Sequence, residues 1–240
     1  IVLATPDEAN RAIATAMDAG MQWARTPAAE RAACLERAAD LLEAECATFL
    51  ALAVREAGKT FGNAVAEVRE AVDFLRYYAG QARAMPDAKP LGPIVAISPW
   101  NFPLAIFMGQ VGAALAAGNP VLAKPAEQTP LIAREAVRIL HRAGVPGAAL
   151  QLLAGRGETI GAALVADPRI AGVIFTGSTD VARLIHRQLA ERDDDPILIA
   201  ETGGMNAMIV DSSALPEQVV ADALASAFDS AGQRCSALRI

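Results

Sequence analysis

The pattern of apolar and polar positions divides the sequence into two regions near Pro93. Before that residue, apolar positions recur at helical spacing in three segments, which predicts helices over residues 8–25, 28–57 and 63–85. Thr26 is expected to cap the second helix with Pro27 at its first position, and Gly58 to end it. Residues 85–93, which include three prolines, form a connector.

After Pro93, short apolar runs alternate with helical stretches. The runs predict strands over residues 94–98, 121–124, 150–153, 173–176 and 197–200, separated by helices over 104–117, 131–143, 160–166 and 179–190. Near-continuous apolar strands suit a sheet that is covered on both faces, and the alternation is typical of right-handed βαβ units. The prediction is therefore an α/β fold with a doubly wound parallel sheet. A short strand at 208–210 and a helix at 215–231 complete the pattern.

The amino-acid composition argues against several classes of protein. With 53% hydrophobic and 20% charged residues, the chain is not disordered. Its net charge of −6, without a Lys/Arg cluster, argues against a nucleic-acid surface. The longest apolar stretch, residues 104–118, contains Gln110 and is shorter than the ~20 residues of a membrane span, so no membrane contact is expected.

The three cysteines are widely spaced, which suggests neither a disulfide framework nor a zinc or other metal site. A reducing, cytoplasmic location fits this usage best. Cys34 and Cys46 lie inside predicted helices and are interpreted as packing residues. His141 and His186 are interpreted as solvated surface residues, which leaves a Cys–His hydrolase poorly supported.

Polar groups or glycines follow each of the five predicted strands. In chain order these segments are Pro99-Trp100-Asn101-Phe102-Pro103, Lys124-Pro125-Ala126-Glu127, Gly155-Arg156-Gly157, Gly177-Ser178-Thr179 and Glu201-Thr202-Gly203-Gly204. Because the carboxyl ends of parallel strands meet at one edge of a sheet, the five segments together predict a site there.

The glycine segments suggest nucleotide binding, and each also has a simpler interpretation. Gly155 and Gly157 resemble part of a dinucleotide fingerprint with one extra spacer, or form an ordinary turn. Ser178 opens a helix whose amides suit a phosphate, or is a plain N-cap. Lys124 and Glu127 could bind ribose hydroxyls, or form a solvated ion pair.

Cys235 differs from the other cysteines because it lies in a polar loop just beyond a predicted helix. A nucleophilic thiol also needs a base and an oxyanion donor, for which the sequence offers Glu201 and Asn101. The alternative is an unreactive surface cysteine.

In order and spacing, the segments 99–103, 124–127, 175–178, 201–204 and 232–235 resemble the signature of the NAD(P)-dependent aldehyde dehydrogenase superfamily. Segments 123–130, 200–215 and 228–239 are similar to the aldehyde dehydrogenase half of the bifunctional proline utilization A proteins. The resemblance implies the N-terminal half of the aldehyde dehydrogenase fold, with a Rossmann-like sheet. It also implies oxidation of L-glutamate γ-semialdehyde to L-glutamate with NAD, in proline catabolism.

The same resemblance implies a role for individual residues. Cys235 would be the nucleophile, Asn101 the oxyanion donor and Glu201 the base that activates water. Ser236 and Phe102 would contact the substrate. The implied cofactor contacts are Ser98, Pro99, Trp100, Lys124, Glu127, Gly155, Gly157, Phe175, Gly177, Ser178, Thr202 and Gly203. A carboxylate at Glu127 would repel a 2′-phosphate, which favours NAD over NADP.

The resemblance also suggests a division of the chain: a helical segment over 1–92, a dinucleotide-binding domain over 93–203, and the truncated opening of a catalytic domain over 204–240. Only five residues follow Cys235, so three interpretations stay open: the dehydrogenase itself, an NAD-binding fragment without catalysis, and a dehydrogenase for another semialdehyde. The expected partners are a small aldehyde and either further copies of the chain or the rest of a larger bifunctional chain.

Overall fold

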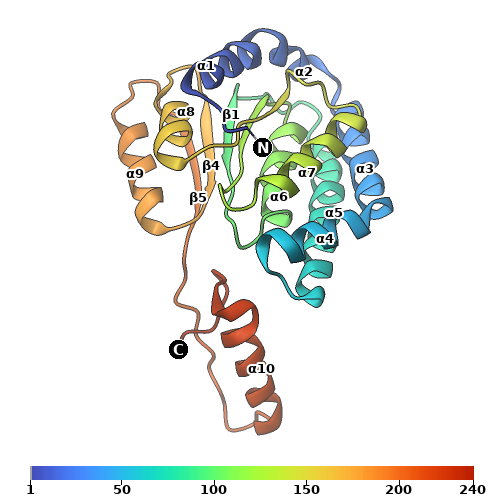
Figure 1. The fold of residues 1–240 in the computed structure, drawn as a ribbon, viewed down its shortest axis with the longest axis vertical. Coiled ribbons are helices and arrows are strands. Elements are labelled where there is room, and N and C mark those ends of the chain that lie inside the picture. The colour runs from blue at the N-terminus through green and yellow to red at the C-terminus, as the bar shows by residue number, and fades with distance from the viewer. Residues whose placement is uncertain (1) are drawn as a thin grey trace.

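The computed structural model describes residues 2–240, and its centre is a five-stranded parallel sheet (Figure 1). The strands are β1 (Ile94–Ile97), β2 (Val121–Lys124), β3 (Leu150–Leu152), β4 (Gly172–Thr176) and β5 (Ile197–Glu201). Their order is β3-β2-β1-β4-β5, so the direction of winding reverses between β1 and β4. The predicted doubly wound α/β fold is confirmed, and the five predicted strands each match an observed one to within a residue.

Helices cover both faces of the sheet. Helices α3 (Ala28–Ala44), α5 (Phe61–Ala84), α6 (Ala105–Ala116) and α7 (Pro130–Arg142) pack on one face. Helices α1 (Pro6–Thr15), α8 (Ala162–Ala166) and α9 (Thr179–Ala190) pack on the other. Because side chains alternate along a strand, Val121 and Ala123 join the first core while Leu122 between them joins the second.

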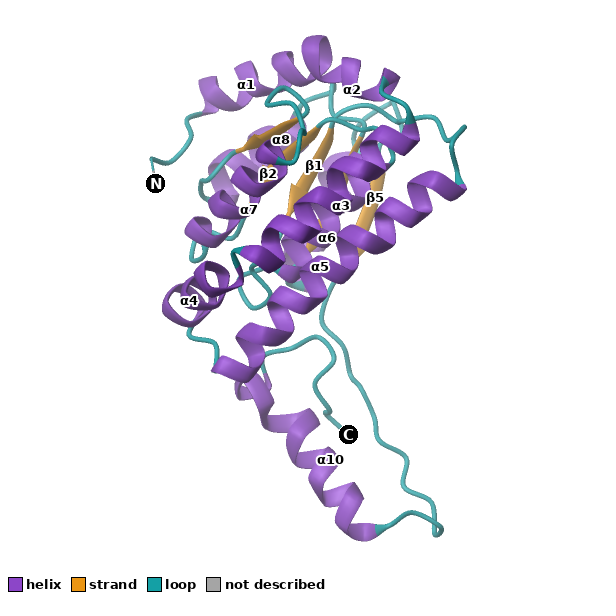
Figure 2. Cartoon of the chain, turned by 90° about the vertical axis from the view of Figure 1, so that its right-hand side faces the viewer, coloured by secondary structure: helices purple, strands orange, loops and turns teal. Residues whose placement is uncertain are grey.

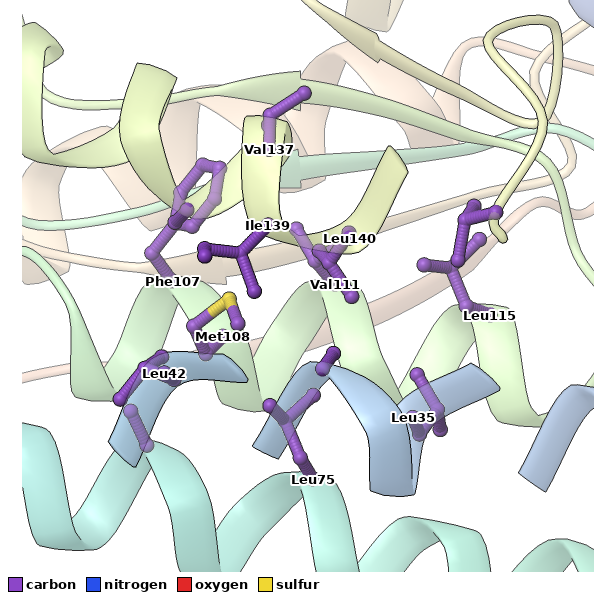
Figure 3. Close-up of a cluster of buried hydrophobic side chains, with 14 of the residues drawn as sticks. Leu35, Leu42, Leu75, Phe107, Met108, Val111, Leu115, Val137, Ile139 and Leu140 are labelled. Atoms are coloured by element: carbon purple, nitrogen blue, oxygen red, sulfur yellow. The ribbon is translucent and has the colours of Figure 1, made fainter. Parts of the chain in front are cut away.

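The larger core lies between the sheet and the layer formed by α3 and α5 (Figure 3). Leu35 and Leu42 of α3 meet Leu75 of α5 and Phe107 and Met108 of α6, and all five are fully buried. Burial of each such side chain contributes about 1.5–3 kcal/mol, so this layer stabilises the sheet through a shared core.

The N-terminal helices differ in detail from the prediction. The single helix expected over 28–57 is two helices, α3 and α4 (Cys46–Ala57), which separate at Glu45. The Glu45 carboxylate binds Arg138 and Arg142 of α7, a distant contact that local spacing does not encode. Pro27 itself is the N-cap of α3, and Thr26 makes no capping bond.

The other predicted helix boundaries in this region agree better with the structure. Gly58 ends α4 in the left-handed conformation, with φ of 65°, as expected. The helix expected over 8–25 consists of α1, a π-helical turn over Ala16–Gly20, and α2 (Met21–Arg25). The helix expected over 63–85 is α5.

Residues 204–240 extend from β5 as an arm whose longest element is α10 (Pro216–Phe228) (Figure 2). The strand expected at 208–210 is wrong: Ile209 is 95% exposed and pairs with no strand among residues 2–240. The helix expected over 215–231 ends at Phe228, because Ser230 and Ala231 adopt left-handed φ values of 54° and 55° in the 3₁₀ turn Asp229–Gly232.

The face of α10 that carries apolar side chains is uncovered in this structure. None of its residues is buried, and Val220, Leu224 and Phe228 are each more than half exposed. Over residues 2–240, no helix combines the length and apolarity that a bilayer span requires.

Candidate functional site

A cavity of about 640 Å³ lies at the carboxyl edge of the sheet, beside the point where the winding reverses between β1 and β4. Doubly wound sheets bind their ligands at such a position. The cavity brings together most of the residues singled out in the sequence: Ser98, Pro99, Trp100, Asn101, Phe102, Phe175, Gly177, Ser178, Thr202, Gly203 and Cys235.

A second cavity, of about 280 Å³, continues along the same edge between α8 and α9. Ile97 and Val181 line both cavities, so the two adjoin. Lys124 and Gly157, both predicted site residues, line the second one. The Lys124 ammonium donates to the Pro125 carbonyl at 3.2 Å, and burial lowers the pKa of Lys124 despite the opposing carboxylates of Glu127 and Glu158.

Four predicted residues line neither cavity. Glu127 and Ser236 are exposed. Gly155 is buried, and a Cβ there would lie 2.4 Å from Ile160, so this glycine permits a tight turn. Glu201 ends β5 with an exposed side chain, while its backbone carbonyl accepts a hydrogen bond from Gly177 N–H at 3.1 Å.

The first turn of α9 faces the larger cavity. The Ser178 hydroxyl accepts a hydrogen bond from Val181 N–H at 3.3 Å, so Ser178 is the N-cap of α9. Both residues line the larger cavity. The two interpretations of Ser178 are therefore compatible: it caps the helix, and it places the amide end of a twelve-residue helix where an anion can bind.

The thiol of Cys235 is exposed, and its loop is held from two sides. The Asn206 amide donates to the carbonyls of Cys235 at 2.6 Å and Ala237 at 3.0 Å. Gly204 approaches so closely that a Cβ there would lie 2.8 Å from the Cys235 carbonyl oxygen. The segment after β5 therefore sets the position of the cysteine backbone.

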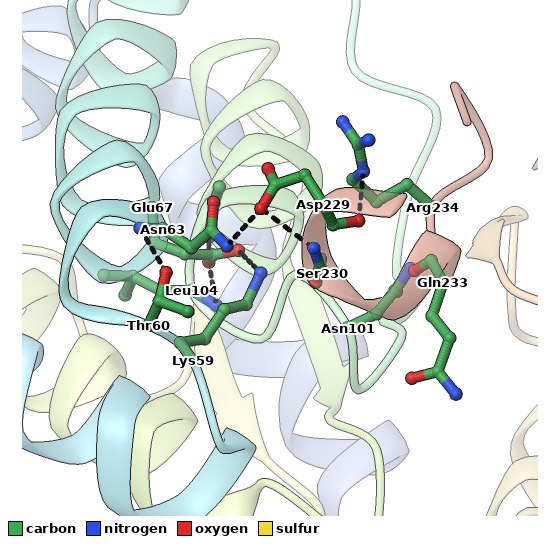
Figure 4. Close-up of polar contacts among 11 residues, drawn as sticks. Lys59, Thr60, Asn63, Glu67, Asn101, Leu104, Asp229, Ser230, Gln233 and Arg234 are labelled. Atoms are coloured by element: carbon green, nitrogen blue, oxygen red, sulfur yellow. Dashed lines mark hydrogen bonds and ion pairs between the residues drawn. The ribbon is translucent and has the colours of Figure 1, made fainter. Parts of the chain in front are cut away.

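Asn101 links the sheet edge to the same loop. Its Nδ2 donates to the Gln233 carbonyl at 2.8 Å (Figure 4). A side-chain amide nitrogen carries two hydrogens, so the second remains available to a group in the cavity. The arrangement holds an amide donor beside the loop of an accessible thiol, which are two of the parts that nucleophilic attack on a carbonyl requires.

The other two cysteines and the histidines lie as expected from the sequence. Cys34 is buried and Cys46 half-buried, and burial raises the pKa of the Cys34 thiol. His141 and His186 are exposed.

Sequence reasoning missed three residues that support the site. Gln110 of α6 accepts from the Ser98 hydroxyl at 2.8 Å and donates to the Thr176 hydroxyl at 2.9 Å, so it braces β1 against β4. Gln110 is a polar residue within the apolar stretch 104–118, which could have indicated that it makes buried hydrogen bonds. Thr176 and Asn206 carried no such signal, because their partners are distant in sequence.

Comparison with known proteins matches residues 1–240 to the aldehyde dehydrogenase family. Bifunctional protein PutA of Escherichia coli (strain K12) is 65% identical over 99% of this chain, which covers 18% of that protein. The 1-pyrroline-5-carboxylate dehydrogenase of Geobacillus thermodenitrificans (strain NG80-2) is 39% identical over 99% of the chain and 50% of that enzyme.

Among solved structures, 1-pyrroline-5-carboxylate dehydrogenase from Thermus with bound NAD superposes with a TM-score of 0.95 at 35% identity, over 99% of this chain and 50% of that one. The chain thus spans about half the length of these dehydrogenases and about a fifth of the PutA relative.

Proposed function

Because the chain belongs to the aldehyde dehydrogenase family, we propose that it carries the cofactor-binding and nucleophile-bearing part of an enzyme that oxidises L-glutamate γ-semialdehyde to L-glutamate with NAD. The observation that carries the proposal is the shared cavity of Cys235 and Asn101 at the carboxyl edge of the sheet. The names of the PutA and 1-pyrroline-5-carboxylate dehydrogenase relatives support this choice of aldehyde.

The residues at the sheet edge fit a dinucleotide. Lys124 is 4% exposed and lines the second cavity, where its ammonium can donate to ribose hydroxyls. The amide end of α9 suits the pyrophosphate, and the larger cavity leaves room for the nicotinamide near Trp100 and Thr202. Glu127 and Glu158 both act on Lys124, and their negative charge disfavours a 2′-phosphate, so NAD is proposed over NADP. When bound, NAD accepts the hydride that leaves the substrate carbon.

The chain's own residues supply the remaining chemistry. The Cys235 thiolate attacks the aldehyde carbon, and the oxygen that becomes negative is stabilised by the free N–H of the Asn101 amide and by Cys235 N–H. Loss of hydride leaves a thioester on Cys235. Glu201 takes a proton from the water that hydrolyses this thioester, which releases the acid and restores the thiol. Phe102 and Ser236 are proposed to contact the substrate.

A second candidate is an NAD-binding fragment without catalysis of its own. The observation behind it is that the chain spans about half the length of the dehydrogenase relatives. Association with further copies or with the rest of a bifunctional chain, the division at residues 92 and 203, and a cytoplasmic location stay predictions.

The test is NADH formation by the full-length protein that contains these residues. We expect turnover with glutamate γ-semialdehyde to exceed that with succinate semialdehyde, and NAD to be preferred over NADP. Cys235→Ala should abolish turnover while calorimetry still detects NAD binding. Cys46→Ala, at a half-buried cysteine of α4, is the matched control and should keep wild-type turnover.

Three results would contradict parts of the proposal. Full turnover in Cys235→Ala would exclude the assigned nucleophile. NAD binding in calorimetry without turnover by residues 1–240 alone would support the second candidate. Faster oxidation of succinate semialdehyde would establish the dehydrogenase for another semialdehyde.

A further inference from the structure

A buried ion pair lies beneath the loop that carries Asn101, and the proposed chemistry does not use it (Figure 4). Lys59 precedes α5 and Glu67 lies in its second turn, with Nζ and Oε1 3.0 Å apart. Their side chains are 5% and 1% exposed. Lysine and glutamate are seldom buried this completely, because removing their charges from water costs free energy that the surroundings must offset.

The Glu67 carboxylate also holds the start of α6. Its Oε2 accepts hydrogen bonds from Leu104 N–H at 3.1 Å and Ala105 N–H at 2.9 Å. Helix α6 has no capping side chain of its own, so Glu67 satisfies amides that would otherwise lack partners. These amides follow Asn101 by three and four residues.

Lys59 contacts the same loop. Its Nζ lies 4.4 Å from the centroid of the Phe102 ring, in cation–π geometry. The ion pair therefore contacts both the residue directly after Asn101 and the beginning of the helix that follows.

The same end of α5 contacts the segment before Cys235. Asn63 Nδ2 donates to Asp229 Oδ1 at 3.1 Å, and that oxygen also accepts from Ser230 N–H at 2.9 Å. Asn101 in turn binds the Gln233 carbonyl. The first two turns of α5 thus touch both the amide donor's loop and the nucleophile's segment.

We propose that Glu67, held by Lys59, is a positioning residue that fixes the Asn101 amide relative to Cys235. The catalytic consequence rests on the proposed function, but the positional claim does not. A displacement near 1 Å of a group that stabilises a transition state lowers a rate by roughly a hundredfold, so a fixed loop start matters for an oxyanion donor.

The kinetic test is a double-mutant cycle in the full-length protein. Glu67→Gln keeps one acceptor oxygen for the two amides and removes the charge that faces Lys59. We expect it to lower kcat about tenfold with KM for NAD unchanged. In an Asn101→Ala background the same substitution should add little, because the group that it positions is already gone.

A matched control exists at Glu56. Its carboxylate accepts from Leu131 N–H at 2.7 Å and Ile132 N–H at 2.8 Å, and so holds the start of α7 as Glu67 holds that of α6. Glu56→Gln should leave kcat unchanged. The proposal would be overturned if Glu67→Gln lowered kcat equally in the wild-type and Asn101→Ala backgrounds. It would also be overturned if Glu56→Gln lowered kcat as much as Glu67→Gln does.

Hydrogen exchange tests the positional claim without relying on activity. Glu67→Gln should accelerate amide exchange over residues 101–105, and Glu56→Gln over residues 131–132 instead. Because Glu67→Gln leaves a buried ammonium without its partner and can disturb folding, Lys59→Met/Glu67→Gln, which removes both charges together, is measured beside it. Unchanged exchange over 101–105 in both variants overturns the proposal. Absence of wild-type aldehyde turnover would contradict only the proposed function. Hydrogen exchange would still test whether Glu67 positions the Asn101 loop.

Discussion

Gly204→Ala tests how strongly the segment after β5 controls the nucleophile. An added Cβ would lie 2.8 Å from the Cys235 carbonyl oxygen, whereas ordinary contact begins at 3.4 Å. The backbones must therefore separate by about 0.6 Å, because neither atom belongs to a flexible side chain. Gly204 does not adopt a positive φ, so alanine adds no backbone strain there. The added Cβ would also lie 3.2 Å and 3.3 Å from the Asn206 amide atoms, and that amide binds the same carbonyl, so the substitution perturbs the Cys235 backbone through both neighbours.

The expected loss follows from this displacement. If about 1 Å costs roughly a hundredfold, then about 0.6 Å costs roughly tenfold in kcat, or about 1.4 kcal/mol of activation free energy. KM for NAD should change less than kcat, because the proposed ribose contact Lys124 lies in the second cavity, away from Gly204. The rate of Cys235 alkylation by iodoacetamide should change as well, independently of turnover.

The matched control is Gly80→Ala in α5, where an added Cβ meets no atom within 4 Å. It should raise stability by about 0.5–1 kcal/mol and leave kcat unaltered. Wild-type kcat together with a wild-type alkylation rate in Gly204→Ala would refute the reasoning, since the contact would then place no constraint on the cysteine.

Three further substitutions have defined outcomes. Burial lowers the pKa of Lys124 from its ordinary value of 10.5. As pH rises, the folded state therefore releases this proton before the unfolded chain does. The free energy of unfolding of the wild type increases over the pH range between the two pKa values. Lys124→Met should remove this gain in thermal unfolding, raise Tm at neutral pH, and weaken NAD binding in calorimetry. Asn119→Ala should cost about 1–3 kcal/mol in urea unfolding, because its Oδ1 accepts from Leu91 N–H at 2.7 Å and Gly92 N–H at 3.1 Å in a buried position. Leu75→Ala should cost about 2–5 kcal/mol in the same assay, because its side chain is fully buried.

The sheet and its helices could be predicted because their signals are local. Strand β2 and helix α9 have the bounds expected from the apolar runs, and Ser178 marks the start of α9 as its cap. The break at Glu45 could not be predicted, because the arginines that bind its carboxylate lie on α7, more than ninety residues away.

The candidate site likewise has parts that the sequence could predict and parts that it could not. Convergence of the five strand ends follows from a parallel sheet, so the loops of Asn101 and Lys124 could be placed at one edge in advance. The bonds from Asn206 to the Cys235 carbonyl and from Gln110 to Thr176 join residues that no spacing rule connects.

Neither α6 nor α7 supplies its own cap. The carboxylates of Glu67 and Glu56, which reach their first amides, come from the layer of α4 and α5. Initiation of both helices therefore depends on contacts that close loops of tens of residues, and closing such loops costs chain entropy. Expressed without α4 and α5, the segment from β1 onward would therefore begin α6 and α7 with unsatisfied amides.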